Sequence, residues 1–419
     1  EGVGPAQLTP DGLRGNYFNE IDRTSTQLEM GVARLQSWGW RGQQHLVKLG
    51  AQVFATSFEG VDRSGPIEVR GADGRLLKRI TFRGPGELEA SDVMTSGYVQ
   101  DHWQVSSRLA LDLGLRYDQS SMISESHLSP RTAFSLALDR AGRTLIKGGW
   151  GLFFDRTFLQ VDAFERFQQR VEQEYDLAGS ARGAPLVFEN RIDPQGFEEP
   201  TSRVWNVEFD RQLTESLLLR VNYRENRARN RLLVNRLTDT AAAALLLSST
   251  GRLTSREFDA TVRWTLANDH GDLYASFSKM RAAGDLNDFG EIYDNHRNPL
   301  LLENQQSFQP FEVPNRLLLW GVVRLPRGIT MTPGIEWRNG FPYTIFNEDY
   351  SVVGDRNSAD YPPFFSADLA VTKRMELVGR RVDVGVQFYN LTSHDNPRDV
   401  LSNLASSGFG SFRNSIGSA

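Results

Sequence analysis

The side chains that could carry out chemistry are scattered along this chain and form no catalytic motif. The six histidines are His45, His102, His127, His270, His296 and His394. No two of them have the spacing of a pair of metal ligands. The absence of cysteine excludes disulfides, thiolate metal sites and cysteine nucleophiles. Because no arrangement of serine, histidine and acid stands out either, the sequence predicts no enzyme, no metal site and no cofactor.

A run of acidic and amide side chains resembles a calcium-binding loop. Its oxygen-bearing residues are Asp285, Asn287, Asp288, Glu291, Asp294 and Asn295. An EF-hand loop needs an oxygen ligand at its fifth position and an acid at its twelfth. Counted from Asp285, these positions hold Phe289 and His296. The pattern therefore favours a solvated loop over a calcium site.

The composition narrows the class of protein further. The chain has 419 residues and a net charge of -5, with acids and bases interspersed. This distribution gives no nucleic-acid footprint. No run of 18 or more apolar residues exists, so we expect no helical membrane span. The first residue is Glu1, with no signal peptide before it, so we expect a processed chain or a fragment.

The elements that must position these residues are strands with one apolar and one polar face. In the segment 107–119, four leucines and a tyrosine alternate with Ala110, Asp112, Gly114, Arg116 and Asp118. Successive side chains of a strand point to opposite faces. The same alternation recurs at 143–155, 204–213, 217–224, 258–266 and 381–391. A sandwich strand has the same pattern, but this many such segments predict an all-β fold, a transmembrane antiparallel β-barrel.

Two segments depart from this pattern. Pro333 lies inside the strand expected at 329–337, where proline removes a ladder hydrogen bond, so we expect a bulge there or a strand that starts at Gly334. Apolar residues at three- and four-residue spacing between Phe158 and Tyr175 predict an amphipathic helix in the loop 156–200. An extended loop segment is the alternative.

The connections between strands alternate in length. Short links are expected at 104–107, 140–143, 214–216, 267–271, 326–328 and 377–380, and long ones at about 60–91, 156–200, 227–252, 282–312, 339–362 and 392–407. Short periplasmic turns and long outer loops are typical of outer-membrane barrels. The count gives about fifteen strands, the last beginning near Gly408. Because an odd number cannot close a bacterial single-chain barrel, we expect the chain to form part of one.

Five segments resemble the barrel of TonB-dependent outer-membrane receptors, most closely the Oar-like group. They are 96–118, 128–156, 200–223, 312–344 and 364–397, so the resemblance covers nearly the whole chain. Precursors in this group carry a carboxypeptidase-regulatory-like domain before the plug. The resemblance implies a barrel of 22 strands, of which residues 1–419 would form a single partial domain. No plug and no TonB-box-like segment is visible, and the chain ends without the usual terminal aromatic. We therefore expect the plug, the early strands and the extreme C-terminus to be missing.

The resemblance also implies a function. It points to an outer-membrane receptor or transporter that binds a scarce extracellular ligand, with uptake energised by the TonB–ExbB–ExbD system through the plug. The protein would be a monomer among lipid and lipopolysaccharide of the bacterial cell outer membrane, with long loops extracellular and short turns periplasmic. Two alternatives stay open: a peptide- or protein-binding or secretion-related Oar-like protein, and a passive porin-like channel. The sequence does not name the ligand, because specificity lies in loops without a readable code.

Aromatic residues in the loops and upper lumen are the first candidates for ligand contact. They are Phe153, Trp337, Phe341 and Tyr343. Flat rings offer contact area at low entropic cost. Phe153 has the inward parity of its strand, whereas Trp337 fits the aromatic girdle of a barrel at least as well. Asp155, two residues after Phe153, is a further candidate.

Four arginines form the second group of candidates. Arg224, Arg227, Arg229 and Arg231 are expected to rise from a strand into its outer loop. There they would form a basic patch at the barrel mouth that attracts anionic ligands or lipopolysaccharide phosphates. A solvated loop whose charges pair with neighbours is the alternative.

Overall fold

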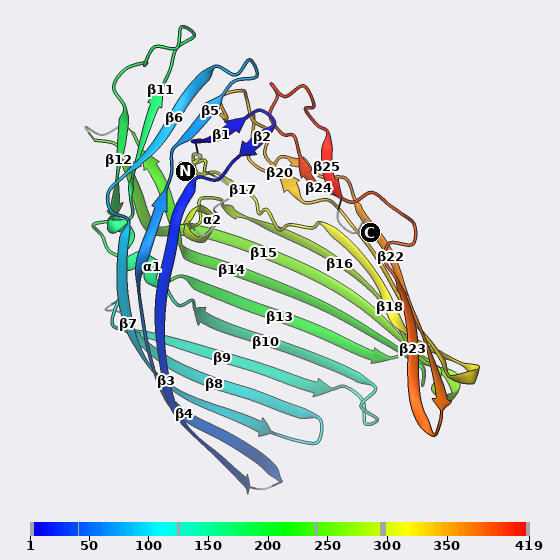
Figure 1. Cartoon of the computed structure of the whole chain (residues 1–419). Coiled ribbons are helices and arrows are strands. Elements are labelled where there is room, and N and C mark those ends of the chain that lie inside the picture. The colour runs from blue at the N-terminus through cyan, green and yellow to red at the C-terminus, as the bar shows by residue number, and fades with distance from the viewer. Residues whose placement is uncertain (1–3, 41, 124–125, 239–241, 294–298, 416–419) are drawn as a thin grey trace.

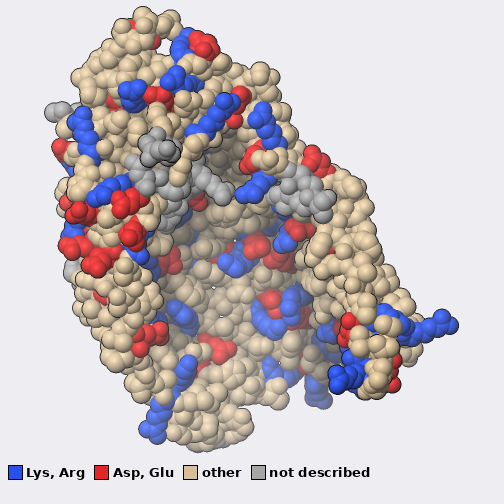
Figure 2. Space-filling view, in the orientation of Figure 1, with Lys and Arg blue, Asp and Glu red and all other residues tan. Residues whose placement is uncertain are grey.

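The main element of the structure is a curved antiparallel sheet (Figure 1), and the space-filling view shows a hollow on its concave side (Figure 2). The structure, a computed structural model, describes residues 4–40, 42–123, 126–238, 242–293 and 299–415. In spatial order the sheet contains β3 (Phe18–Trp40), β4 (Gln43–Ser64), β7 (Glu87–Gln104), β8 (Leu109–Ser120), β9 (Ser126–Ala137), β10 (Thr144–Phe154), β13 (Thr201–Gln212), β14 (Leu217–Leu237), β15 (Ala244–Leu266), β16 (Gly271–Asp285), β18 (Asn315–Leu325), β19 (Ile329–Arg338), β22 (Phe364–Leu377) and β23 (Arg380–Phe388). Each of these fourteen strands pairs antiparallel with the next.

The two faces of this sheet differ as the alternating pattern predicts. In β13, the exposed side chains Trp205, Val207 and Phe209 lie on the convex face. Asp210 lies on the concave face, 2.7 Å from the ammonium group of Lys147 in β10. Figure 2 shows further charged side chains of both signs in the hollow. Ion pairing lowers the free energy needed to remove these charged groups from water when they lie on this wall. The sheet therefore has an apolar outer face and a polar inner face, as a barrel wall between lipid and water requires.

Short turns join the strands at one end of the sheet and most long connections lie at the other. The predicted long connection at 227–252 is wrong, because β14 and β15 continue as a paired hairpin as far as Leu237 and Ala244. Apolar residues in both strands extend the pairing beyond the wall. The predicted alternation of long and short connections is also broken between β8 and β9. These strands are joined by the short connection 121–125, which lies at the end of the sheet where most connections are long.

Pro333 does not shorten its strand or create a bulge. β19 begins at Ile329 and pairs with β22 without interruption, Pro333 lying opposite Leu369. On the other side, pairing with β18 is broken between Gly334 and Met331 and resumes in the same register. The missing amide hydrogen of proline thus interrupts one ladder locally, and the continuous β22 ladder keeps the strand in place.

The connections at the long-loop end fold into a second layer, called the outer layer, which lies beyond the ends of the wall strands. Its strands are β1 (Ala6–Thr9), β2 (Gly12–Arg14), β5 (Ile67–Arg70), β6 (Leu76–Arg83), β11 (Gln169–Glu174) and β12 (Leu186–Ile192). They pair in the order β2-β1-β5-β6-β11-β12, and β12 also pairs with β15. Shorter elements complete this end of the molecule: α1 (Leu159–Asp162), α2 (Phe289–Tyr293), β17 (Gln306–Phe308), β20 (Pro342–Tyr343) and β21 (Ala359–Asp360).

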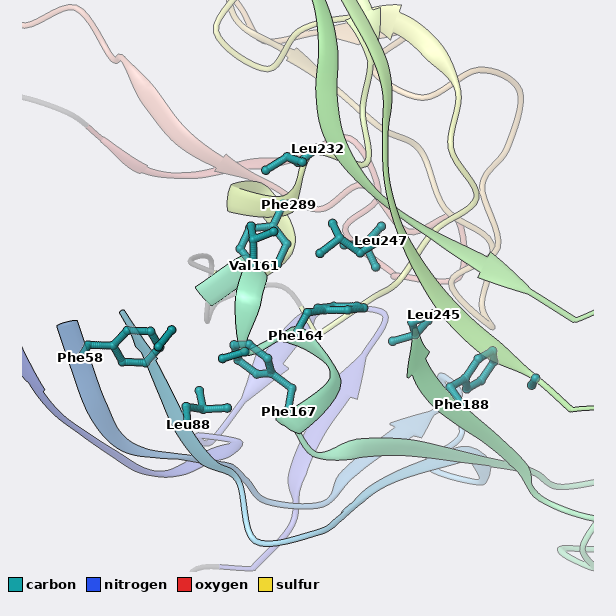
Figure 3. Packing of buried hydrophobic residues seen from close by; sticks show 14 residues of the cluster. Phe58, Leu88, Val161, Phe164, Phe167, Phe188, Leu232, Leu245, Leu247 and Phe289 are labelled. Carbon is teal, nitrogen blue, oxygen red and sulfur yellow. The ribbon is translucent and has the colours of Figure 1, made fainter. Parts of the chain in front are cut away.

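A hydrophobic core holds the outer layer to the tops of the wall strands (Figure 3). Phe164 and Phe188, from the connection 155–200, are fully buried in one cluster with Leu247 of β15 and Phe289 of α2. Burying a phenylalanine side chain contributes about 1.5–3 kcal/mol. The burial of several such side chains therefore stabilises the outer layer as a folded unit packed against the wall strands.

The helix predicted between Phe158 and Tyr175 is correct only in its first part. The segment forms α1 and a single 3-10 turn at 164–166, and β11 then pairs with β6. Long-range pairing with β6 outweighs the local helical spacing in the second part. No helix in the described ranges is long and apolar enough to cross a membrane.

The segment after β23 also differs from expectation. The strand predicted to begin near Gly408 is instead β25 (Phe412–Ser415), which pairs with β24 (Pro397–Val400) in a separate small sheet. Contacts with other loops hold this segment away from β23. The Ser406 hydroxyl, for example, donates a hydrogen bond of 2.7 Å to the Asp11 carboxylate near the N-terminus.

Candidate functional site

The inner wall carries a cavity of about 420 Å³ on β7 to β10 and β13. Gly114, Gly149 and Gly151 are among its lining residues, together with Arg131 and Phe153. A Cβ atom at Gly151 would lie 2.8 Å from the Phe153 ring, so that ring rests directly on the glycine backbone. Glycine in a strand commonly marks a close approach of another group. Here glycines leave room for a cavity beside an aromatic ring.

The charge of this cavity comes mainly from arginine. The Arg131 guanidinium lies 4.5 Å from the centroid of the Phe153 ring, a cation–π contact. Arg116 is neutralised by Asp118 at 2.8 Å. In the described part of the chain, Arg131 makes no such ion pair. The lining also contains the Asp112 carboxylate, which lies 2.8 Å from the His102 ring, so the cavity offers a cation outside any ion pair next to a flat ring, a combination that suits an anionic group.

Phe153 is thus on the inner wall, as its parity predicts, but its neighbour Arg131 was not singled out from the sequence. Arg131 has the same inward parity as Ala133, two residues further along β9, and lies opposite Gly114. This inward parity is the feature of the sequence from which Arg131 could have been identified as a residue of the inner wall. Asp155 follows the end of β10, where its amide donates a hydrogen bond of 2.8 Å to the Pro200 carbonyl.

The four candidate arginines do not form one patch, and their predicted loop location is wrong because all four lie within β14. Arg224 has the parity of the concave face and lies opposite Asn206 and Glu257. Arg227 has the opposite parity and pairs with Glu225. The same parity places Arg229 on the convex face.

Arg231 has a third environment. A bulge in the pairing of β14 with β15, where Asn230 has a φ of 56°, separates it from Arg227 and Arg229. The Arg231 guanidinium is 2.8 Å from the Asp288 carboxylate. One strand thus directs its arginines to the inner wall, the outer face and a loop contact, because side chains alternate along a strand.

The three later aromatic candidates, Trp337, Phe341 and Tyr343, also lie in different environments. Trp337 lies opposite Leu317 of β18 and shares its outward parity, which fits the girdle interpretation. Phe341 and Tyr343 lie beyond the end of β19. The Arg338 guanidinium is sandwiched there, 4.5 Å from the Phe341 ring centroid and 4.4 Å from that of Phe364.

The surroundings of this sandwich form a second cavity, of about 290 Å³, which includes Phe341 and Tyr361. Tyr343 packs edge to face against Tyr361, with ring centroids 5.3 Å apart. Sequence reasoning identified two of these rings and missed Arg338, Tyr361 and Phe364. A proline-rich, aromatic stretch at 361–365 was the signal for the latter two.

The acidic run considered for calcium is occupied by internal contacts. Asp285 accepts hydrogen bonds from the Arg252 amide at 2.7 Å and from Asn304 at 2.8 Å. Asp288 is paired with Arg231. Asp294, Asn295 and His296 lie outside the described residues. Across the described ranges, no group of three or more metal-ligating residues has the arrangement of a metal site.

Comparison with known proteins identifies the fold. No family model matches the sequence, and no curated protein matches it. Solved structures do: the chain is similar to the outer-membrane transporter YddB from Escherichia coli, with 13% identity, a TM-score of 0.67, and coverage of 93% of this chain and 53% of that one. It is also similar to the siderophore receptor PirA from Acinetobacter baumannii, with 13% identity, a TM-score of 0.61, and coverage of 94% and 54%.

A third neighbour is the ferric citrate transporter FecA in its unliganded form, with 11% identity, a TM-score of 0.56, and coverage of 94% and 55%. The chain thus spans about half the length of each of these proteins. The fold is that of the β-barrel of outer-membrane receptors, and the predicted fold class is confirmed. At this level of identity the likeness shows the fold alone.

Proposed function

We propose that the protein is an outer-membrane receptor that binds a scarce extracellular ligand for uptake energised by the TonB–ExbB–ExbD system. The observation that carries this proposal is the cavity beside Arg131 and Phe153 on the inner wall of a receptor-type barrel. A ligand moving through the lumen would meet this wall. YddB and FecA are transporters, and PirA is a siderophore receptor, which supports the receptor class.

Within this proposal, ligand capture begins at the mouth and continues along the wall. Phe341 would provide the first contact in the cavity around Arg338, and Tyr343 would hold the Tyr361 ring of that cavity in place. Phe153, Arg131 and Arg224 would provide contacts inside the lumen, with Asp155 at its upper edge. The folded outer layer would restrict passage, which favours a selective receptor over an open channel.

The test is uptake by cells that express the full-length protein. A deletion strain, a complemented strain and a strain without TonB are supplied in turn with ferric siderophores, cobalamin and oligosaccharides, each labelled. The proposal predicts at least one substrate whose uptake requires both the protein and TonB. Uptake that persists without TonB would indicate the porin-like alternative. Surface binding of peptide or protein with no uptake would indicate the Oar-like binding or secretion alternative.

A further inference from the structure

The convex face of the wall carries a group of basic side chains above its apolar band. These residues, termed here the outer basic patch, follow the apolar band in the direction of the long connections on four consecutive strands: Arg203 of β13, Arg227 and Arg229 of β14, Arg256 of β15, and Lys279 and Arg281 of β16. All six residues are exposed.

Strand parity places the patch on the lipid-facing side. Arg203 has the parity of Trp205 and Val207, Arg256 that of Phe258, and Lys279 and Arg281 that of Phe277. Each of these apolar side chains is exposed on the convex face. The patch therefore lies directly beyond aromatic residues such as Trp205, whose ring centroid is 5.2 Å from that of Tyr223. An aromatic girdle occupies the interface level of a barrel, so the patch lies at the height of lipid head groups.

Like charges face each other within the patch. Arg203 lies opposite Arg227, and Arg256 lies opposite Arg281. Directly opposed like charges in a sheet are destabilising unless something neutralises them. One carboxylate, that of Glu225, is close: it contacts Arg227 and lies 3.1 Å from Arg256.

The remaining cations lack such a partner. Among the residues that the structure describes, Arg203, Arg229, Lys279 and Arg281 form no ion pair. The Arg281 guanidinium lies 5.1 Å from the centroid of the Phe308 ring. Four exposed cations outside any ion pair thus surround one internally neutralised group, at a surface where an anion from the membrane can reach them.

We propose that the outer basic patch binds the phosphate groups of a phosphorylated glycolipid, lipopolysaccharide, in the outer leaflet. Guanidinium groups match phosphate geometry through paired hydrogen bonds, and the apolar band below the patch would pack against the acyl chains. The occupant is a lipid because the patch continues into the lipid-facing surface and points away from the lumen. This proposal is independent of which ligand the lumen transports.

The test compares two double variants of the full-length protein purified in detergent. Arg203→Gln with Arg281→Gln removes two unpaired cations from the outer face. Arg220→Gln with Arg263→Gln serves as the control: it removes the same number of cations from the inner face, where they pair with Asp210 and Asp272. Native mass spectrometry measures the affinity for diphosphorylated lipid A, for its dephosphorylated form and for inorganic phosphate. A gel shift on heating verifies that both variants are folded.

Each cation near an anionic lipid surface contributes about a fivefold change in affinity. We therefore expect the outer-face variant to bind diphosphorylated lipid A about 25-fold more weakly, and the control to change by less than about twofold. Equal binding of phosphorylated and dephosphorylated lipid A would overturn the proposal. So would an equal loss in both variants, or binding of inorganic phosphate as tight as that of the lipid.

Discussion

Glu172 in β11 is the most informative position for testing how the outer layer is held together. Its carboxylate is buried and lies 2.6 Å from Arg170, 3.0 Å from Arg236 and 3.7 Å from Lys78. These three cations come from β11, β14 and β6, so one carboxylate links the outer layer to a wall strand. Removing its charge would leave the buried Arg170 and the half-buried Arg236 without the carboxylate that pairs with them.

The pKa of Glu172 gives the size of this effect. Burial alone would raise the pKa, but the charges of Arg170, Arg236 and Lys78 outweigh it and lower the pKa from 4.5 to about 2. This difference corresponds to about 3 kcal/mol in favour of the charged carboxylate. Because the pKa is lower in the folded protein, the stabilisation is fully present above pH 4.5 and is lost as the pH falls toward 2.

We therefore predict that Glu172→Gln destabilises the outer layer by about 3 kcal/mol at neutral pH. Hydrogen exchange of the amides in β11 and β12 measures this change. The matched control is Glu189→Gln, which removes an exposed carboxylate that lies 2.5 Å from Arg191 in β12. An exposed pair contributes about 0–1 kcal/mol. Equal exchange in the two variants, or a wild-type layer that loosens already between pH 7 and 5, would refute the reasoning.

Three further predictions concern the wall. Val384→Arg on the convex face should destabilise the refolded protein by about 2–4 kcal/mol, and Gln387→Arg on the concave face by much less; equal costs in lipid titrations would mean that the faces are reversed. A cysteine at Ala178, in the turn between β11 and β12, should react with an impermeant maleimide on intact cells, and one at Ala141, in a short turn, only after the outer membrane is breached; Thr240, in the long connection predicted at 227–252, lies outside the described residues. Gly60→Ala should weaken β3–β4 pairing in hydrogen exchange, because its Cβ would lie 2.1 Å from the Asp22 carbonyl oxygen; unchanged protection would contradict this.

The wall was predictable from the sequence because its signal is local. A strand between lipid and water must alternate, so residues such as Trp205 and Asn206 reveal their faces one by one. The outer layer was not predictable, because its strands depend on distant partners. The Ala72 amide, for example, donates a hydrogen bond of 2.9 Å to the carboxylate of Glu348, and a Cβ atom at the neighbouring Gly71 would lie 2.7 Å from that carboxylate.

The candidate site was predictable to a similar degree. Parity placed Phe153 on the inner wall correctly. The arginines were placed incorrectly, because no local pattern marks the continuation of β14 past Arg227 as far as Leu237. Once a strand replaces a loop, Arg227 and Arg229 point to lipid and Arg224 to the lumen. The cation–π contact of Arg131 required the register between β9 and β10, which a single sequence does not reveal.

The central claim is that the curved sheet is a membrane wall with lipid on its convex face and water on its concave face. Spin labels at successive positions 205–209 of β13, in the full-length protein within outer membranes, test it most directly. Collisions with oxygen and with a water-soluble nickel complex are measured for each label. We predict an alternation of period two, in which collisions with oxygen dominate at 205, 207 and 209 and collisions with the nickel complex dominate at 206 and 208. Equal access of the nickel complex to all five positions would contradict it.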